Sequence, residues 1–243
     1  MIYFISDIHL GLFERSKDRQ TEELLMRFLE KIKNDAETLY IVGDLFDYWF
    51  EYKSVIPKYF YRTLTKLSEL SEAGVKIEYL MGNHDFGHFQ FFEEELGIKI
   101  EKDDIRREYN GKMFYISHGD GKANNDTGYR ILKKILRSGW ANFLFRLIHP
   151  DFGIKLAHSS SKTSRNYTDT KNYGKSEGLD EFAENKISEG FDFVIMGHRH
   201  RLIFKNIRNG VYINLGDWIS NPHYAVFDGM EMQLLEVRNL LKN

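Results

Sequence analysis

Short runs of apolar residues recur along the chain, and each run predicts a buried strand. The five main runs occupy residues 1–6, 38–42, 75–81, 112–117 and 191–196. Apolar residues follow one another in these runs instead of alternating with polar ones, as in strands that are covered on both faces. Two later runs, at residues 210–216 and 224–229, predict further strands, and Asp228-Gly229 predicts a turn into an antiparallel partner.

Apolar residues at helical spacing lie between the first three runs. In residues 21–34 they share one stripe, and Thr21 is predicted to cap that helix. Residues 59–74 show the same pattern and end at Gly74, which suits the left-handed position after a helix. The order strand, helix, strand predicts an α/β fold with helices packed against the sheet.

Residues 122–177 break this rhythm. They contain two helical patterns, at residues 127–139 and 140–149, followed by a polar and serine-rich run. We interpret the segment as a helical cap inserted into a single domain that spans residues 1–243, because a chain of 243 residues is a usual size for one α/β domain.

The composition is that of an ordinary globular protein, with 42% hydrophobic and 29% charged residues. The net charge of −2 argues against a general coat for nucleic acid. There is no cysteine, so a metal site must use His, Asp, Glu or Asn. No basic leader and no long apolar run occurs, which predicts no signal peptide, no spanning helix and a cytoplasmic location.

Each of the five main runs ends in a small polar cluster. The clusters are Asp7-Ile8-His9, Gly43-Asp44, Gly82-Asn83-His84-Asp85, His118-Gly119-Asp120 and Gly197-His198-Arg199-His200. In open α/β sheets, ligands bind beyond the carboxyl ends of the strands, so these clusters are expected to meet at one site. Their glycines would let the backbone turn sharply and approach that site closely.

The side chains of these clusters are metal ligands by type. The candidates are Asp7, His9, Asp44, Asn83, His118, His198 and His200. Seven ligands are too many for one ion and suit two ions that share a bridging carboxylate, an arrangement that clamps a phosphoryl group and activates water. On an extended backbone, His198 and His200 would point the same way and address both ions.

Each cluster alone could be a plain turn or a helix cap. Five of them, in order and all at strand ends, contain five of the nine histidines and favour a reaction centre. The remaining histidines are predicted to be partly exposed or capping residues: His88, His149, His158 and His223.

The five clusters together resemble the sequence blocks of the calcineurin-like metallophosphoesterases. The resemblance spans Asp7 to His200 and implies a four-layer α/β/β/α sandwich with two divalent metal ions, most typically Mn²⁺, although the ligands also accept Fe, Zn, Ni or Co. It implies Asp7, His9 and His200 at the first metal, Asn83, His118 and His198 at the second, and Asp44 as the bridge. His84 would lie beside the metals as a catalytic residue without binding them.

Within the family, the chain is similar to the bacterial UDP-2,3-diacylglucosamine diphosphatases of lipid A synthesis. The segments LYIVGDLFDYWF, SHGDGKANNDTGYR and INLGDW carry this likeness. It implies a nucleotide-sugar lipid substrate, with UMP and 2,3-diacylglucosamine 1-phosphate as products. One branch of these enzymes has Arg after the motif Asn, where this chain has His84.

Further roles follow for residues around the metals. The expected substrate contacts are Asn83, His84, Asp126, Tyr129, Arg165, Asn166, Lys171 and His198. Three carboxylates, Asp47, Asp85 and Asp120, are candidates to orient the ligating histidines from behind.

The predicted cap mixes lysine and arginine with tryptophan, phenylalanine and leucine. Such a segment can hold acyl chains or contact the cytoplasmic face of the inner membrane, but it can equally pack as ordinary helices. Two other functions stay open: a phosphodiesterase or phosphatase acting on another small phosphoester or nucleotide, and a metal-binding scaffold without activity. No nucleic-acid partner is expected, and the oligomeric state is not predicted.

Overall fold

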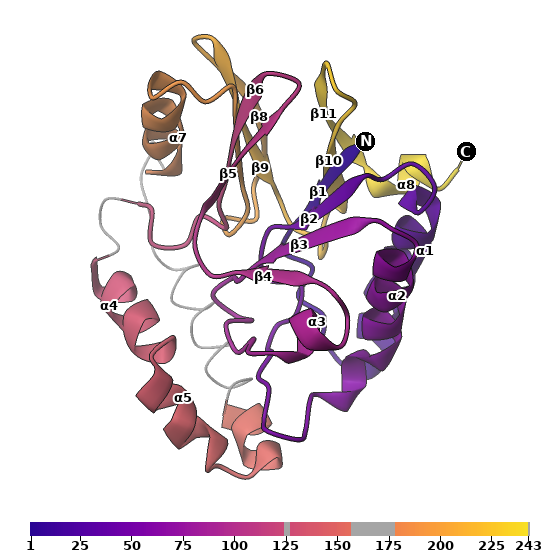
Figure 1. Ribbon diagram of the computed structural model, residues 1–243, viewed down its shortest axis with the longest axis vertical. Coiled ribbons are helices and arrows are strands. Elements are labelled where there is room, and N and C mark those ends of the chain that lie inside the picture. The colour runs from indigo at the N-terminus through magenta and orange to yellow at the C-terminus, as the bar shows by residue number, and fades with distance from the viewer. Residues whose placement is uncertain (124–126, 157–177, 243) are drawn as a thin grey trace.

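Two β-sheets pack face to face between layers of helices in the computed structural model, which describes residues 1–123, 127–156 and 178–242 (Figure 1). The first sheet contains, in spatial order, β11 (Met232–Glu236), β10 (His223–Phe227), β1 (Ile2–Ile5), β2 (Thr38–Ile41), β3 (Lys76–Leu80) and β4 (Lys99–Glu101). The second contains β5 (Ile105–Tyr109), β6 (Lys112–Ile116), β7 (Phe193–Met196), β9 (Gly210–Leu215) and β8 (Leu202–Ile207).

Helices cover the outer faces of both sheets. The described helices are α1 (Arg15–Ile32), the 3-10 turn η1 (Lys58–Phe60), α2 (Tyr61–Glu72), α3 (Phe91–Glu94), α4 (Thr127–Leu136), α5 (Gly139–Arg146), α7 (Leu179–Ser188) and α8 (Val237–Leu240), and residues 150–156 are helical as well. In Figure 1, α1 and α2 lie against the first sheet and α7 lies against the second. Helices α4 and α5 lie on the side of the molecule away from α1 and α2.

Strand β1 shows how the layers form. Its side chains alternate: Phe4 packs with Phe114 of the opposite sheet, at a ring distance of 6.2 Å, whereas Tyr3 packs on Phe28 of α1, also at 6.2 Å. A third apolar cluster, around Tyr212, joins the second sheet to α7. Because both faces of each central strand are buried, the apolar runs need no polar alternation, and the predicted α/β/β/α order is confirmed.

The central strands run parallel, which places their carboxyl ends together. Strands β1, β2 and β3 are mutually parallel, as are β6, β7 and β9. The outer strand pairs β10–β11, β5–β6 and β8–β9 are antiparallel, which confirms the hairpin predicted at Asp228-Gly229. The strand ends of both sheets therefore face one common site.

The structure differs from the sequence prediction in several local respects, among them the helices α3, α7 and α8, which were not predicted. Strands β4, β5 and β8 were not predicted, because they lie at sheet edges and mix exposed polar residues with apolar ones. Helix α1 begins at Arg15, so the prediction that Thr21 caps it is wrong. The added turn is held by Asp18, whose carboxylate accepts a hydrogen bond from the Gly11 amide at 2.7 Å.

Gly74 ends α2 as predicted. Its φ is +94°, and its amide donates to the Ser71 carbonyl at 2.9 Å.

The surface formed by α4, α5 and residues 147–156 exposes many apolar side chains. Among them are Trp140, Phe143, Leu147 and Phe152, each more than 60% accessible. Among the described residues, no helix has the length and apolar character needed to cross a bilayer.

Candidate metal centre and the cavity beside it

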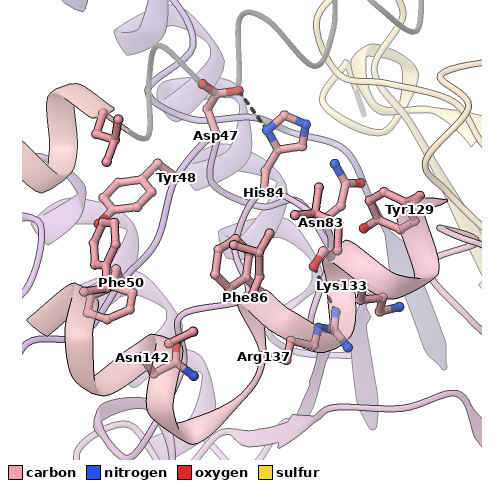
Figure 2. Close-up of a pocket in the computed structure, with 16 residues that line it drawn as sticks. Asp47, Tyr48, Phe50, Asn83, His84, Phe86, Tyr129, Lys133, Arg137 and Asn142 are labelled. Atoms are coloured by element: carbon pink, nitrogen blue, oxygen red, sulfur yellow. Dashed lines mark hydrogen bonds and ion pairs between the residues drawn. The ribbon is translucent and has the colours of Figure 1, made fainter.

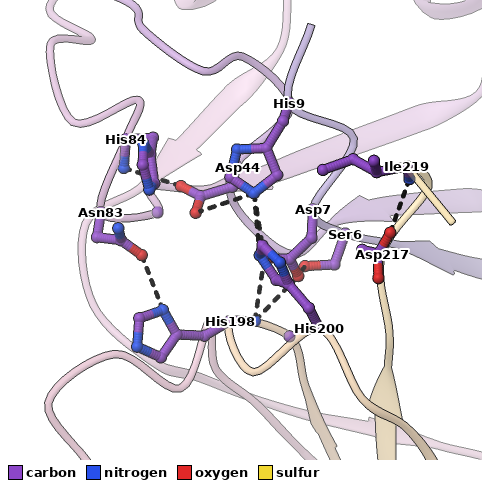
Figure 3. Close-up of polar contacts among 12 residues, drawn as sticks. Ser6, Asp7, His9, Asp44, Asn83, His84, His198, His200, Asp217 and Ile219 are labelled. Carbon is purple, nitrogen blue, oxygen red and sulfur yellow. Dashed lines mark hydrogen bonds and ion pairs between the residues drawn. The ribbon is translucent and has the colours of Figure 1, made fainter. Parts of the chain in front are cut away.

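The polar clusters that follow β1, β2, β3, β6 and β7 meet at one place, and Figure 3 shows residues from those after β1, β2, β3 and β7. In the first group, Nε2 of His200 lies 3.1 Å from Nε2 of His9 and 3.3 Å from Oδ1 of Asp7. The same oxygen of Asp7 is 3.7 Å from Nε2 of His9. Three atoms with lone pairs thus face one another closely enough to share a metal ion.

A second group lies beside the first. Oδ1 of Asn83 is 3.0 Å from Nε2 of His118 and 2.8 Å from Nδ1 of His198. Oδ2 of Asp44 is 3.2 Å from the same nitrogen of His118. An amide oxygen, a carboxylate oxygen and two imidazole nitrogens could therefore hold another divalent ion.

Asp44 stands between the two groups. Its Oδ2 atom, next to His118, is also 3.8 Å from Nε2 of His9. Its Oδ1 atom accepts a hydrogen bond from the His84 amide at 2.9 Å. One oxygen is thus fixed by the backbone while the other faces both candidate metal positions, as a bridging ligand requires.

The backbone bends sharply at these residues. Five of the seven non-glycine residues with positive φ in the described part of the chain are candidate ligands: Asp7, His9, Asp44, His198 and His200. Residues outside the usual φ range cost free energy and persist where the surroundings hold them, often at functional sites. The expectation that His198 and His200 lie on an extended backbone is wrong, since their φ values are +71° and +53°. The two rings reach different groups because of these bends.

Three glycines make room for the ligands. A Cβ atom on Gly43 would lie 2.4 Å from Nδ1 of His118, and one on Gly82 would lie 2.0 Å from Oδ1 of Asp44. A Cβ atom on Gly197 would lie 2.3 Å from Oδ2 of Asp7. Any side chain at these positions would displace a candidate ligand.

Burial shapes the electrostatics of the centre. Burial alone would raise the pKa of Asp7, but hydrogen bonds with His200 and His9 hold it well below its usual range. Burial would likewise lower the pKa of His118, yet the charge of Asp44 raises it to about 10. Burial and the nearby His118 lower the pKa of His198 to about 3. Buried carboxylates that stay ionised and favour the protonated form of a neighbouring histidine would also stabilise a divalent cation.

The carboxylates expected to orient histidines behave differently from one another. Oδ1 of Asp47 lies 3.5 Å from Nδ1 of His9 and 3.6 Å from Nδ1 of His84, as expected. Among the contacts described, Asp85 instead accepts from the Gly82 amide at 2.9 Å and from the Tyr79 hydroxyl. It therefore supports the loop backbone and not an imidazole.

Asp120 also departs from that expectation. In the described part of the chain it accepts from the Tyr129 hydroxyl at 2.7 Å and pairs with Nζ of Lys133 at 2.7 Å. The Nδ1 atom of His118 is oriented by a backbone group, the Val42 carbonyl at 2.8 Å. The sequence could not predict this contact, because every residue carries a backbone carbonyl and residue type does not show which one lies behind His118.

Two further residues support the ligand loops and were not predicted. The Ser6 hydroxyl contacts Asp7 and donates to the Val42 carbonyl at 2.9 Å. The Asn214 side chain donates to the Gly197 carbonyl at 2.8 Å and so holds the loop that carries His198. Ser6 adjoins Asp7 in sequence, but Asn214 lies in β9 and only the fold brings it close.

The remaining histidines differ in burial. His88 is 1% exposed, so the prediction that it is partly exposed or capping is wrong. Its ring stacks on Trp49 at 5.7 Å and meets Tyr79 and Phe92 edge-on, inside an aromatic cluster. His149 and His223 are not buried, and His158 lies outside the described residues.

A cavity of about 330 Å³ adjoins the metal centre beneath α4 and α5 (Figure 2). One end is formed by Asn83, His84 and Asp47, and the walls are mostly apolar. The wall residues include Tyr48, Phe50, Phe86, Leu132, Leu136, Ala141, Phe145 and Leu156. Phe145 of α5 packs on Phe50 at 4.5 Å, which attaches α5 to the loop after β2.

Of the expected substrate contacts, Asn83, His84 and Tyr129 line this cavity. His198 lies at the metal centre, with its ring 6.4 Å from that of Tyr129. The others lie outside the described residues: Asp126, Arg165, Asn166 and Lys171.

Comparison with known proteins finds similarity along most of the chain. A family model described as calcineurin-like phosphoesterase matches residues 1–202. A protein of Porphyromonas gingivalis named UDP-2,3-diacylglucosamine hydrolase is 34% identical, with 98% of each chain covered. A protein of Stutzerimonas stutzeri with the same name is 31% identical over 90% of this chain and 91% of its own.

Among solved structures, an archaeal phosphodiesterase covers 97% of this chain and 98% of its own, at 16% identity and a TM-score of 0.47. The family match covers most of the chain and includes all five ligand clusters. The chain belongs to the calcineurin-like phosphoesterases, a family of metal-dependent hydrolases.

Proposed function

We propose that this protein hydrolyses UDP-2,3-diacylglucosamine to UMP and 2,3-diacylglucosamine 1-phosphate. The observation that carries the proposal is the apolar cavity beneath α4 and α5, which opens onto Asn83 and His84. A substrate with acyl chains next to a diphosphate needs an apolar chamber beside a phosphate-binding centre. The names of the Porphyromonas and Stutzerimonas relatives support the same substrate.

Two divalent ions would serve the reaction, with Mn²⁺ as the proposed metal. Asp7, His9 and His200 would hold one ion, and Asn83, His118 and His198 the other, with Asp44 between them. Such ions supply positive charge to the phosphoryl oxygens and make water nucleophilic near neutral pH.

The residues of the chain keep this arrangement rigid. Asp44 sets the spacing of the two groups, because its Oδ1 atom is held by the His84 amide. Asp47 faces the rings of His9 and His84 and would fix their orientation. Rigid placement lets charge stabilisation act without reorganisation during the reaction.

His84 is the proposed catalytic side chain that does not bind metal. It lies at the junction of the metal centre and the cavity (Figures 2 and 3). From there its ring could donate a hydrogen bond to a phosphoryl oxygen or a proton to the leaving phosphate. An imidazole nitrogen of His84 lies within 4.8 Å of donor atoms of His9 and Asp44, so the ring lies beside the position that a metal-bound phosphate would take.

Contact of the cap with the cytoplasmic face of the inner membrane is part of the proposal. The side chains of Trp140 and Phe143 on α5, and of Leu147 just after it, are exposed. Lys134 on α4 and Lys155 in the helical residues 150–156 are exposed as well. Apolar and aromatic side chains flanked by lysine suit the interface of an anionic bilayer. A lipid substrate could then enter the cavity directly from the membrane.

The decisive experiment offers the Mn²⁺-loaded protein two substrates in parallel. UDP-2,3-diacylglucosamine should yield UMP at a higher kcat/KM than bis-p-nitrophenyl phosphate yields nitrophenol. Turnover of the diester alone would contradict the lipid substrate and leave a phosphodiesterase. Loss of turnover in both assays after chelation would support the metal requirement.

A further inference from the structure

Lys133 occupies a particular position on the inner wall of the cap. It lies on α4 one turn after Tyr129 and one turn before Arg137, and all three line the cavity beside Asn83 (Figure 2). Its side chain is 26% exposed, and its Nζ atom pairs with Oδ2 of Asp120 at 2.7 Å. A lysine on this wall is a positive charge at the edge of the metal centre.

The neighbouring cations of the cap are engaged differently. The Arg137 guanidinium donates to three backbone carbonyls, at 2.6 Å to Lys102, 3.1 Å to Met81 and 3.0 Å to Gly82. Arg146 lies over the Phe89 ring at 4.2 Å. The Arg137 contacts fasten α4 to the ends of β3 and β4, and the Arg146 contact fastens α5 to the loop after β3. Moving either arginine would loosen these helices.

Exchange of the Lys133–Asp120 contact would leave the contacts of both arginines in place. Its partner Asp120 also accepts a hydrogen bond from the Tyr129 hydroxyl at 2.7 Å, which remains if the lysine moves. The lysine stem is flexible and carries a compact charge, which suits a donor that changes partners. Among the described cations of the cavity wall, Lys133 is therefore the one best placed to meet a ligand.

Lys133 also lies between two cavities of opposite character. It lines the apolar chamber and, on its other side, a polar pocket of about 260 Å³. The other residues of that pocket are Asp103, Asp104, Arg106, Tyr115 and Lys122. A substrate with its apolar end in the first cavity and its polar end in the second would place its charged middle close to Lys133.

We propose that Lys133 exchanges Asp120 for the second phosphate of a diphosphate substrate, the phosphate that is not held by the metal ligands. This inference rests on the proposed function in taking the substrate to be a phosphoanhydride. It makes Lys133 a specificity residue that separates diphosphates from simple phosphoesters. A charged hydrogen bond of this kind is worth about tenfold or more in affinity.

The test compares two ligands that differ by one phosphoryl group. UDP and UMP are titrated by calorimetry into the Mn²⁺-loaded wild-type protein and into Lys133→Gln, Lys133→Arg and Lys134→Gln. Lys134 is the matched control, since it is the adjacent lysine on α4 and is exposed. We expect Lys133→Gln to weaken UDP about tenfold and UMP by less than about twofold, with partial recovery in Lys133→Arg and no change in Lys134→Gln.

Three results would overturn the inference. These are wild-type protein that binds UDP no more tightly than UMP, equal weakening of both ligands by Lys133→Gln, and no weakening of either. Equal weakening with a lower unfolding temperature would mean that the lysine only supports Asp120. Failure of the proposed function would appear separately, as wild-type protein that releases no UMP from UDP-2,3-diacylglucosamine, and the titrations would still decide the role of Lys133.

Discussion

The backbone amide of His84 donates a hydrogen bond to Oδ1 of Asp44 at 2.9 Å. The loop after β3 thereby fixes the carboxylate that follows β2 and turns its other oxygen toward both groups of candidate ligands. The residue proposed as a catalytic acid and the residue proposed as the metal bridge are thus tied through the main chain. A substitution at Asp44 can keep this hydrogen bond and remove the negative charge of the carboxylate.

Asp44→Asn makes that separation. The amide oxygen can still accept from His84, but the side chain loses the negative charge that two cations would share. We expect retained folding, loss of bound metal and a fall in kcat larger than the about 10–100-fold that loss of a residue supporting a metal ligand costs. Metal content by mass spectrometry and turnover at saturating Mn²⁺ measure this. Asp151→Asn is the control, since its side chain is 82% exposed; full activity of Asp44→Asn would contradict the bridging role.

His84→Ala should separate catalysis from metal binding. The proposed role of the ring is general acid or electrophile, an effect of about 10²–10⁴-fold in rate. We expect kcat to fall in that range while the metal content stays at the wild-type value. A parallel loss of one metal equivalent would show that His84 is a ligand after all.

Gly82→Ala should damage the centre by sterics alone. The new Cβ atom would lie 2.0 Å from Oδ1 and 2.6 Å from the backbone nitrogen of Asp44. Overpacking of this kind costs about 1–3 kcal/mol, and we expect a lower free energy of unfolding together with lost activity. Gly139→Ala is the control, because its Cβ atom would meet nothing within 4 Å. Equal stability of the two variants in urea would refute the steric argument.

Ala141→Trp should fill the apolar part of the cavity and leaves every candidate metal ligand unsubstituted. Ala141 lines the chamber on α5. We expect kcat/KM for the lipid substrate to fall at least about tenfold, while hydrolysis of bis-p-nitrophenyl phosphate is unchanged. An equal fall for both substrates would mean that the substitution distorts the centre and does not block an acyl chamber.

His88 should make stability depend on pH. Burial and the charge of Arg137 lower its pKa from 6.5 to about 3. The folded state keeps His88 neutral, whereas the unfolded chain takes up a proton there below pH 6.5. The contribution of His88 to the free energy of unfolding is therefore present in full above pH 6.5 and is lost as pH falls toward 3.

His88→Phe removes this titration and keeps a ring among Trp49, Tyr79 and Phe92. We expect the free energy of unfolding of the wild type, relative to the variant, to be constant above pH 6.5. Below it, the difference should fall by about 1.4 kcal/mol per pH unit. Urea unfolding at several pH values measures it, and a difference independent of pH would contradict a buried neutral histidine.

The strand ends were predictable because their signals are local. An apolar run followed by Gly43-Asp44 or Gly82-Asn83 marks a buried strand and its polar end without any knowledge of the neighbours. The parallel order of the central strands then follows from the helical patterns between them, and it brings the ends together. The sequence by itself therefore determined the buried strands with their polar ends and the set of candidate ligands, whereas the four-layer order was implied by the resemblance to the family.

Only the tertiary structure decided how those ligands are held. The left-handed backbone at His198 and His200, the Val42 carbonyl behind His118 and the burial of His88 depend on contacts between distant segments. The cavity and the Lys133–Asp120 pair likewise arise where the cap meets the sheet ends. Residue types along a chain specify which groups can bind a metal or a phosphate, whereas distances between elements, which only folding sets, specify which of them do so together.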